Sequence, residues 1–242
     1  MASAKQDYGN YKWMLELSAE GWAWEFLRRN PSYRRHYIAC NKADEIVASR
    51  MAHRWGLLQF VDPEVDARSA IVFWNPTKNQ SVLSLETAGE ARNGLGGVEC
   101  HVSLLEPAWS DQRHVLYSSG GRFLQLAISG KGDLNRVRFV MDVLPKTNGD
   151  RMLVALRKFA DLIKHKRLRP ELYSRQKRGP RLSHIAQILD LYASNPSHRS
   201  IARDVFGRER ADEEWDNLRD HVRRAVAAGR KLTQRGYLEF LS

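Results

Sequence analysis

The sequence predicts an α+β protein, in which N-terminal helices and a mostly antiparallel sheet precede an all-helical C-terminal domain of helix-turn-helix type. Three observations predict this fold class. Apolar residues recur at helical spacing at both ends of the 242-residue chain, they alternate at strand spacing between those ends, and glycines separate the alternating runs. A linker at 145–149, which contains proline and glycine, divides the chain into expected domains of residues 1–148 and 149–242.

The first sixty residues are expected to be helical. A first helix should end at Asn30-Pro31, because proline disfavours helical geometry in the residue before it. A second amphipathic stretch covers residues 41–57. Dense aromatic residues here either pack in a core or form a protein interface, where aromatic side chains are common anchors, and stacking on RNA is a third use. The interface candidates are Trp22, Trp24, Phe26, Tyr33 and Tyr37.

The β-type pattern begins at about residue 69. Short runs rich in β-forming residues follow, and the clearest is 136–143, where Val137, Phe139, Met141 and Val143 share one face. We expect a meandering sheet whose strands lie near residues 70–74, 81–85, 98–104, 114–117, 122–128 and 136–143.

Four helices are expected in the C-terminal domain, at residues 152–163, 182–192, 197–206 and 216–234. Ser197 should cap the third of these, because its hydroxyl can accept hydrogen bonds from free amides of the first turn. Gly207 should end it, since glycine is common just after a helix. A short helix, a turn and a long basic helix form the helix-turn-helix arrangement, although the turn at 208–215 is longer than usual for that motif.

Positive charge is concentrated in the C-terminal domain. The chain has a net charge of +11, and residues 151–242 hold 21 Lys and Arg against 11 Asp and Glu, or +10 of that total. Such segregation indicates a surface for an acidic partner, of which nucleic acid is the commonest. A basic protein that is merely soluble is the alternative.

The long helix carries the predicted contacts to DNA. A helix fits the major groove, where a guanidinium can pair with the two acceptors of guanine, and flanking cations neutralise phosphates. We expect Arg219, Arg223 and Arg224 to contact bases, and Arg230, Lys231 and Arg199 to lie at the phosphates. The alternative is a plain helical bundle with a solvated arginine face.

A second basic element precedes this motif. Residues 164–181 are rich in Lys and Arg, with only Glu171 against them. An arm of this kind can follow phosphates without recognising sequence, and its candidate contacts are Arg175, Lys177 and Arg178. A solvated linker explains the composition equally well.

Enzymatic chemistry is weakly represented, and we expect no enzyme, cofactor or metal site. His221, Arg224 and Tyr237 resemble the catalytic set of tyrosine recombinases, but the tyrosine follows the arginine too closely. The acidic residues at 212–216 lack a histidine partner, and Cys40 and Cys100 lie in no metal-binding spacing. With no apolar run of membrane-spanning length and no signal segment, the chain is expected in the cytoplasm.

Several stretches resemble the signature of RovC-like transcription regulators, namely residues 122–127, 156–178, 197–202 and 219–224. Residues 24–37 resemble the domain often found ahead of that signature, whereas residues 60–120 match nothing. The resemblance implies a C-terminal domain that binds double-stranded promoter DNA and an N-terminal domain for assembly or regulation. It also implies a homo-oligomer, up to a hexamer, that activates type VI secretion genes and can contact RNA polymerase. An antiactivator that binds only proteins is the rival hypothesis.

Overall fold

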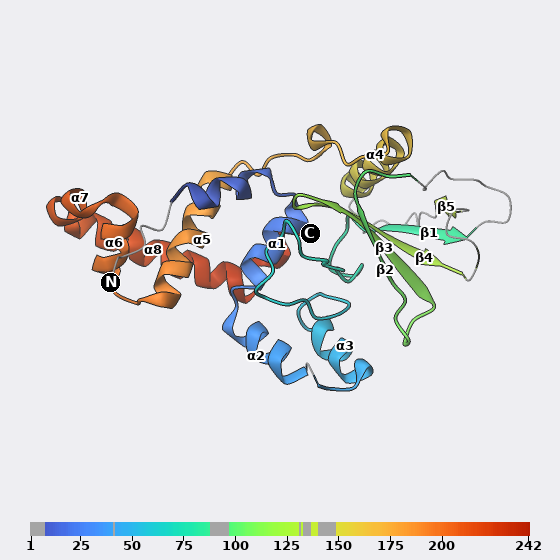
Figure 1. Ribbon diagram of the computed structural model, residues 1–242, viewed down its shortest axis with the longest axis horizontal. Coiled ribbons are helices and arrows are strands. Elements are labelled where there is room, and N and C mark those ends of the chain that lie inside the picture. The colour runs from blue at the N-terminus through green and yellow to red at the C-terminus, as the bar shows by residue number, and fades with distance from the viewer. Residues whose placement is uncertain (1–7, 41, 88–96, 131, 133–136, 140–148) are drawn as a thin grey trace.

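The computed structural model describes residues 8–40, 42–87, 97–130, 132, 137–139 and 149–242. Figure 1 shows an elongated molecule with a helical end on the left and a twisted sheet on the right. The long C-terminal helix joins the helical end to the centre of the molecule, where it meets the first helix of the chain. Residue 136 and residues 140–143 of the expected strand at 136–143 lie outside the described residues, and so does most of the expected linker at 145–149.

Four helical segments begin the chain: η1 (Tyr8–Glu16), α1 (Ala19–Leu27), α2 (Pro31–Cys40) and α3 (Glu45–His53). The side chain of Asn30 separates α1 from α2, because its oxygen accepts hydrogen bonds from the amides of Ser32 and Tyr33 at 2.7 and 3.1 Å. Pro31 occupies the first helical position, where a missing N–H has no cost. The prediction that a helix ends before Pro31 is therefore confirmed.

Among the described residues, five strands form one sheet in the order β2-β3-β4-β1-β5. They are β1 (Leu83–Thr87), β2 (His101–Leu105), β3 (Gln112–Ser119), β4 (Arg122–Ser129) and β5 (Val137–Phe139). The sheet is mostly antiparallel, as expected, but it is not a simple meander, because β1 pairs with β4 in parallel. Helix α4 (Gly149–His165) packs on one face through Phe159 and Leu162.

The expected strand at residues 70–74 is not part of this sheet. The segment instead forms an isolated bridge between Leu57 and Trp74 and covers the sheet face opposite α4. The buried side chain of Gln125 takes the place of a neighbouring strand: it accepts from the Trp74 amide at 2.9 Å and donates to the Trp74 carbonyl at 2.8 Å. The amide and carbonyl of Trp74 are thus satisfied by this side chain, while the carbonyl of Phe73 accepts from the amide of Leu58 at 2.9 Å.

The C-terminal helices are α5 (Gly179–Ser194), α6 (His198–Phe206), α7 (Arg208–Glu213) and α8 (Trp215–Gln234), with short η2 (Pro170–Leu172) and η3 (Gly236–Phe240). Ser197 caps α6 by accepting from the Ser200 amide, and Gly207 ends it with a φ of 90°. Both predictions are confirmed. The long expected turn at 208–215 contains the additional helix α7.

Two large clusters of buried side chains divide the molecule. One combines the N-terminal helices with α5, α6 and α8, and includes Trp22, Ile188, Val222 and Tyr237. The other lies between the sheet and α4. Each cluster therefore contains residues from both of the expected domains, 1–148 and 149–242. The boundary between these two domains stays a prediction.

Four of the five aromatic interface candidates lie inside the first cluster. Trp22, Trp24, Phe26 and Tyr33 are each fully buried, and their rings stack on or meet one another and neighbours such as Phe240. This placement favours the core interpretation for these four side chains. Tyr37 of α2 differs, because its side chain remains partly exposed and lies beside the ring of Phe60.

Candidate nucleic-acid interface

Helix α8 is amphipathic along its whole length. Leu218, Val222, Val226 and Gly229 form its buried side. Gly229 is required by the close approach of α5, because a Cβ at this position would lie 2.6 Å from Cγ of Leu189. All five cationic candidates on α8 are exposed, and these are Arg219, Arg223, Arg224, Arg230 and Lys231.

Acidic side chains accompany the arginines in the first half of α8. Arg219 lies 3.3 Å from Asp216 and 3.9 Å from Asp220, and Arg223 lies 3.4 Å from Asp220. The arginine side chains remain 51% and 67% exposed, respectively. Exposed pairs of this kind contribute ~0–1 kcal/mol, so a phosphate or a guanine can compete for either guanidinium.

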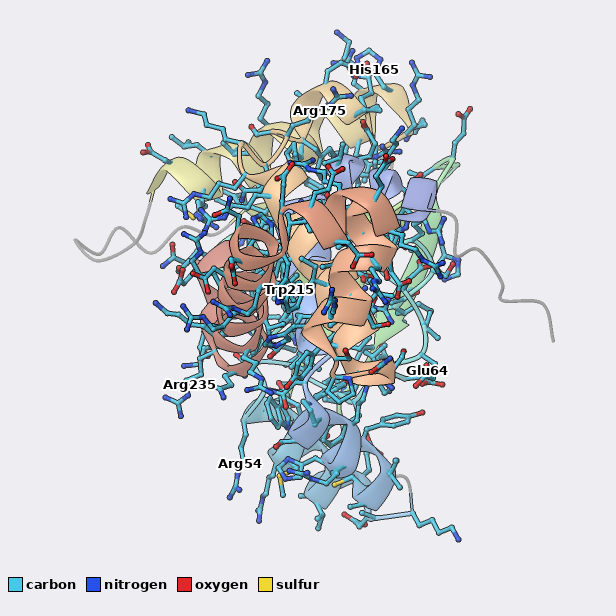
Figure 2. The ribbon with its side chains drawn as sticks, turned by 90° about the vertical axis from the view of Figure 1, so that its left-hand side faces the viewer. Arg54, Glu64, His165, Arg175, Trp215 and Arg235 are labelled. Atoms are coloured by element: carbon cyan, nitrogen blue, oxygen red, sulfur yellow. The ribbon has the colours of Figure 1, made fainter. Side chains whose placement is uncertain are left out.

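Asp212 of α7 binds two arginines of α6. Arg203 lies 2.7 Å and Arg199 3.2 Å from the same carboxylate oxygen. Hydrogen bonds from both arginines lower the pKa of Asp212, and the bond from Arg203 has the larger effect. Arg199 also lies over the ring of Trp215, 5.4 Å from its centroid, at the start of α8. These contacts join α6, α7 and α8 at the end of the molecule that faces the viewer in Figure 2, where Trp215 is labelled.

The second basic element leads into α5. Arg175 forms an ion pair with Glu16 of η1 at 2.7 Å. Lys177 and Arg178 are exposed, and within the described chain neither forms an ion pair. Arg178 and Arg181 line a shallow hollow together with Lys231 of α8. The structure therefore brings two sequence-predicted phosphate contacts, Arg178 and Lys231, to the same surface.

A pair of histidines packs between α5 and α8. The Nε2 atoms of His184 and His221 are 3.1 Å apart, and both rings contact Phe206 of α6. Burial lowers the pKa of both imidazoles, and the positive charges of Arg224 and Arg181 lower that of His221 further. This pair ties the last turn of α6 to the two longer helices.

The recombinase-like residues do not meet. Tyr237 is buried in η3, and its hydroxyl donates to the carbonyl of Trp55 at 3.1 Å. His221 contacts His184 instead, and ten residues of α8 between Arg224 and Gln234 span about 15 Å. Tyr237 is therefore held apart from His221 and Arg224, the two residues with which the recombinase comparison grouped it.

Sequence reasoning missed the acidic partners and two of the cations. Arg203 and Arg181 belong to the basic surface, and the i, i+3 spacing of Asp216 and Asp220 to the arginines could have indicated their pairing. Arg178 and Lys231 line the same hollow only because α5 and α8 cross, and no local sequence pattern contains that crossing.

Over the described residues, no helix is long and apolar enough to cross a membrane. The same part of the chain contains no group of three or more His, Cys, Asp or Glu side chains placed to hold a metal ion. Cys40 and Cys100 are both unpaired thiols.

Two family models match the chain. Residues 5–60 match the proteobacterial transcriptional regulator-like domain. Residues 143–242 match the RovC DNA-binding domain, described as a DNA-binding domain of a type VI secretion (T6SS) transcription factor. No curated protein and no solved structure matches the chain. The second match begins near the expected linker and includes all the DNA-binding candidates, whereas residues 61–142, with all five strands, lie outside both matches.

Proposed function

Since this chain is a RovC-like regulator, with an N-terminal transcriptional regulator-like domain and a C-terminal DNA-binding domain, we propose that it regulates transcription by binding duplex promoter DNA through α8. In this proposal α8 enters the major groove, as the second helix of a helix-turn-helix does. Arg219, Arg223 and Arg224 make or adjoin the base contacts. The promoters are those of type VI secretion genes.

The observation that carries the proposal is the placement of these arginines. They lie within two turns of one helix, all are exposed, and α6 and α7 pack beside that helix at one end of the molecule. A guanidinium in the major groove can pair with both acceptors of guanine. Buried residues on the opposite side of α8 hold the helix against α5. The arginines are therefore presented on a rigid support.

Phosphate contacts flank the base contacts on both sides. Arg199 lies on α6 beside Trp215, while Arg230 donates to the hydroxyl of Tyr192 at 3.2 Å and lies over its ring. Arg175, Lys177, Arg178 and Lys231 supply the remaining cations of the proposed interface. Contacts of this type position the protein on DNA, whereas base contacts confer specificity.

We further propose that the protein acts as an oligomer and as an activator, a hexamer being one form of the assembly. Exposed aliphatic side chains of α2 and α3 support an assembly role for the N-terminal region: Ile38 is 72% exposed, and Ile46 and Val47 are 45% and 53% exposed. Light scattering of the full chain and of an Ile38→Ser variant tests the assembly. A reporter fused to the target promoter, assayed with and without the protein, distinguishes activation from repression.

Fluorescence anisotropy with a promoter fragment and a random duplex, repeated over a salt series, tests the interface. Arg223→Ala should reduce the discrimination between the two duplexes by about 1–3 kcal/mol. Lys177→Ala should weaken both duplexes alike and make the salt slope shallower by about 0.9. The control is Arg138→Ala on β5, which removes the same charge from the sheet.

Two outcomes would overturn the proposal. Unchanged binding in both Arg223→Ala and Lys177→Ala would remove α8 and its preceding segment from the interface. An absence of salt-dependent binding to any duplex would favour the rival hypothesis of an antiactivator that contacts only proteins. A covalent DNA adduct that depends on Tyr237 would establish recombinase chemistry instead.

A further inference from the structure

Two adjoining hollows meet at the C-terminal end of α8. One lies between α5 and α8 and is lined by Arg178, Arg181 and Lys231. The other lies between α8 and the N-terminal helices, and its cations are Arg54, Lys78, Lys231 and Arg235. Lys231, Gly236 and Glu239 line both. We name the two hollows together the basic groove.

The basic groove is strongly unbalanced in charge. Its six Lys and Arg residues face Glu239, the single carboxylate among the lining residues. All six cations are exposed, and within the described part of the chain none of them has an ion-pair partner. This differs from the first half of α8, where Asp216 and Asp220 accompany the arginines. The unpaired cations of this region therefore gather in the groove.

The two sides of the groove are held in one frame. The side-chain Nδ2 of Asn30 donates to the carbonyl of Thr233 at 2.7 Å, and the hydroxyl of Tyr237 donates to the carbonyl of Trp55 at 3.1 Å. The first bond joins the junction of α1 and α2 to the last turn of α8, and the second joins the turn after α3 to η3. Arg54 and Lys78 consequently keep a fixed relation to Lys231 and Arg235, and Figure 2 shows Arg54 and Arg235 extending on the same side of the molecule.

A structural role accounts for part of this charge. Arg54 and Arg235 are the C-caps of α3 and α8, where a cation is stabilised by the helix dipole. That explanation does not apply to Lys78 in the loop between Trp74 and β1, nor to Arg178 and Arg181 at the start of α5, where a helix end disfavours cations. The helix dipole therefore does not explain these three cations, whereas a bound external anion would.

We propose that the basic groove holds the phosphodiester backbone of duplex DNA next to the segment bound by α8, so that the N-terminal domain contributes DNA contacts through Arg54 and Lys78. The inference rests on the proposed function and extends it. Arg178 and Lys231 already belong to the proposed phosphate contacts, and the groove continues from them to α3. A continuous row of cations is suited to a polyanion, whose neutralised phosphates release counterions.

The test measures the binding of fluorescein-labelled duplex of arbitrary sequence over a salt series, because phosphate contacts are independent of sequence. A double variant, Arg54→Ala with Lys78→Ala, removes two contacts and should make the slope of log affinity against log salt shallower by about 1.8. The loss should be larger for a duplex extended by about 10 base pairs, one helical turn, on each side. Charge reversal, Arg54→Glu with Lys78→Glu, should weaken binding further.

The matched control is Arg138→Ala with Arg157→Ala, which removes two exposed cations from β5 and α4, outside the groove. A salt slope in the groove variant equal to that of the wild type would overturn the inference. So would saturable binding of inorganic phosphate or ATP that is lost in the groove variant while its duplex binding is unchanged, because the groove would then be a small-ligand site.

Arg223→Ala, measured in parallel, separates this inference from the proposed function. If Arg223→Ala loses discrimination while the groove variant keeps the wild-type salt slope, only the groove inference fails. If the wild-type protein shows no salt-dependent duplex binding, both fail.

Discussion

Arg29, in the turn after α1, and Asp190 of α5 form a two-point ion pair, with Nε and one terminal nitrogen of the arginine 2.9 and 2.8 Å from the two carboxylate oxygens. The same guanidinium contacts buried Glu25 at 2.5 Å, and Tyr11 donates to Asp190 at 2.7 Å. Burial alone would lower the pKa of Arg29, but the charges of Asp190 and Glu25 raise it overall. The pair therefore links the regulator-like domain to the DNA-binding domain through a charged network.

Arg29→Met should destabilise the protein by about 3–5 kcal/mol, because it leaves Glu25 buried with one cationic partner fewer and removes the partner of Asp190. The free energy of unfolding, measured by urea denaturation, checks this value. Arg68→Met is the control, since its pair with Asp66 is more exposed, with the two side chains 50% and 25% accessible, and should contribute less than about 1 kcal/mol. Equal losses in the two variants would contradict a coupling role for Arg29.

The helices at the two ends of the chain were predictable because the sequence signals for a helix are local. Ser197, Gly207 and the apolar stripe of α8 each act within a few residues of chain, and the structure confirms the helices that they indicate. The parallel pairing of β1 with β4 was not predictable in the same way. It joins Leu83 to Leu126, and no periodicity in either strand specifies its partner.

Residues 70–74 show why a correct local pattern can still mislead. Their β-branched and aromatic residues suit an extended backbone, and the segment is extended and buried at Val72, Phe73 and Trp74. Its hydrogen-bonding partners are the backbone of Leu58 and the side chain of Gln125, which lies fifty-one residues from Trp74 in sequence. For the candidate site, the sequence likewise indicates the exposed arginines, but the placement of Arg178 and Lys231 around one hollow depends on the tertiary crossing of α5 and α8.

Gly229→Ala should destabilise the protein by about 1–3 kcal/mol, because the added Cβ would lie 2.6–2.7 Å from three carbon atoms of Leu189 and would push α5 from α8. Thermal unfolding checks the loss, and duplex binding should weaken as the support of α8 shifts. Gly149→Ala is the matched control, since its Cβ would meet no atom within 4 Å. A stable Gly229→Ala variant would mean that Leu189 can move aside without cost.

His114 should make the protein sensitive to acid. Its side chain is 1% exposed on β3, and burial lowers its pKa to about 4. The pKa of His114 is about 6.5 in the unfolded protein and lower in the folded one, so the unfolded state binds a proton first as the pH falls. The folded state therefore keeps its full stability above pH 6.5 and loses stability as the pH falls towards 4.

Between pH 7 and pH 4.5 this group should account for a loss of about 2–3 kcal/mol in the free energy of unfolding. In His114→Leu the loss over the same interval should be smaller by that amount. Each protein's own value at pH 7 is the reference, so any packing cost of leucine cancels. Identical pH dependence in the two proteins would show that the buried imidazole accepts its proton in the folded state without penalty.

If α8 binds DNA as proposed, Asp220 should limit its affinity, because the carboxylate lies 3.4 Å from Arg223 and repels phosphate. Asp220→Asn should tighten binding to a random duplex about two- to five-fold, equivalent to the ~0.4–1 kcal/mol of an exposed ion pair. Asp111→Asn, the same change in an exposed residue beside β3, should have no effect. A carboxylate can also accept a hydrogen bond from the amino group of cytosine. If Asp220→Asn instead weakened binding to a promoter fragment alone, Asp220 would contact a base and would not lower the affinity for DNA.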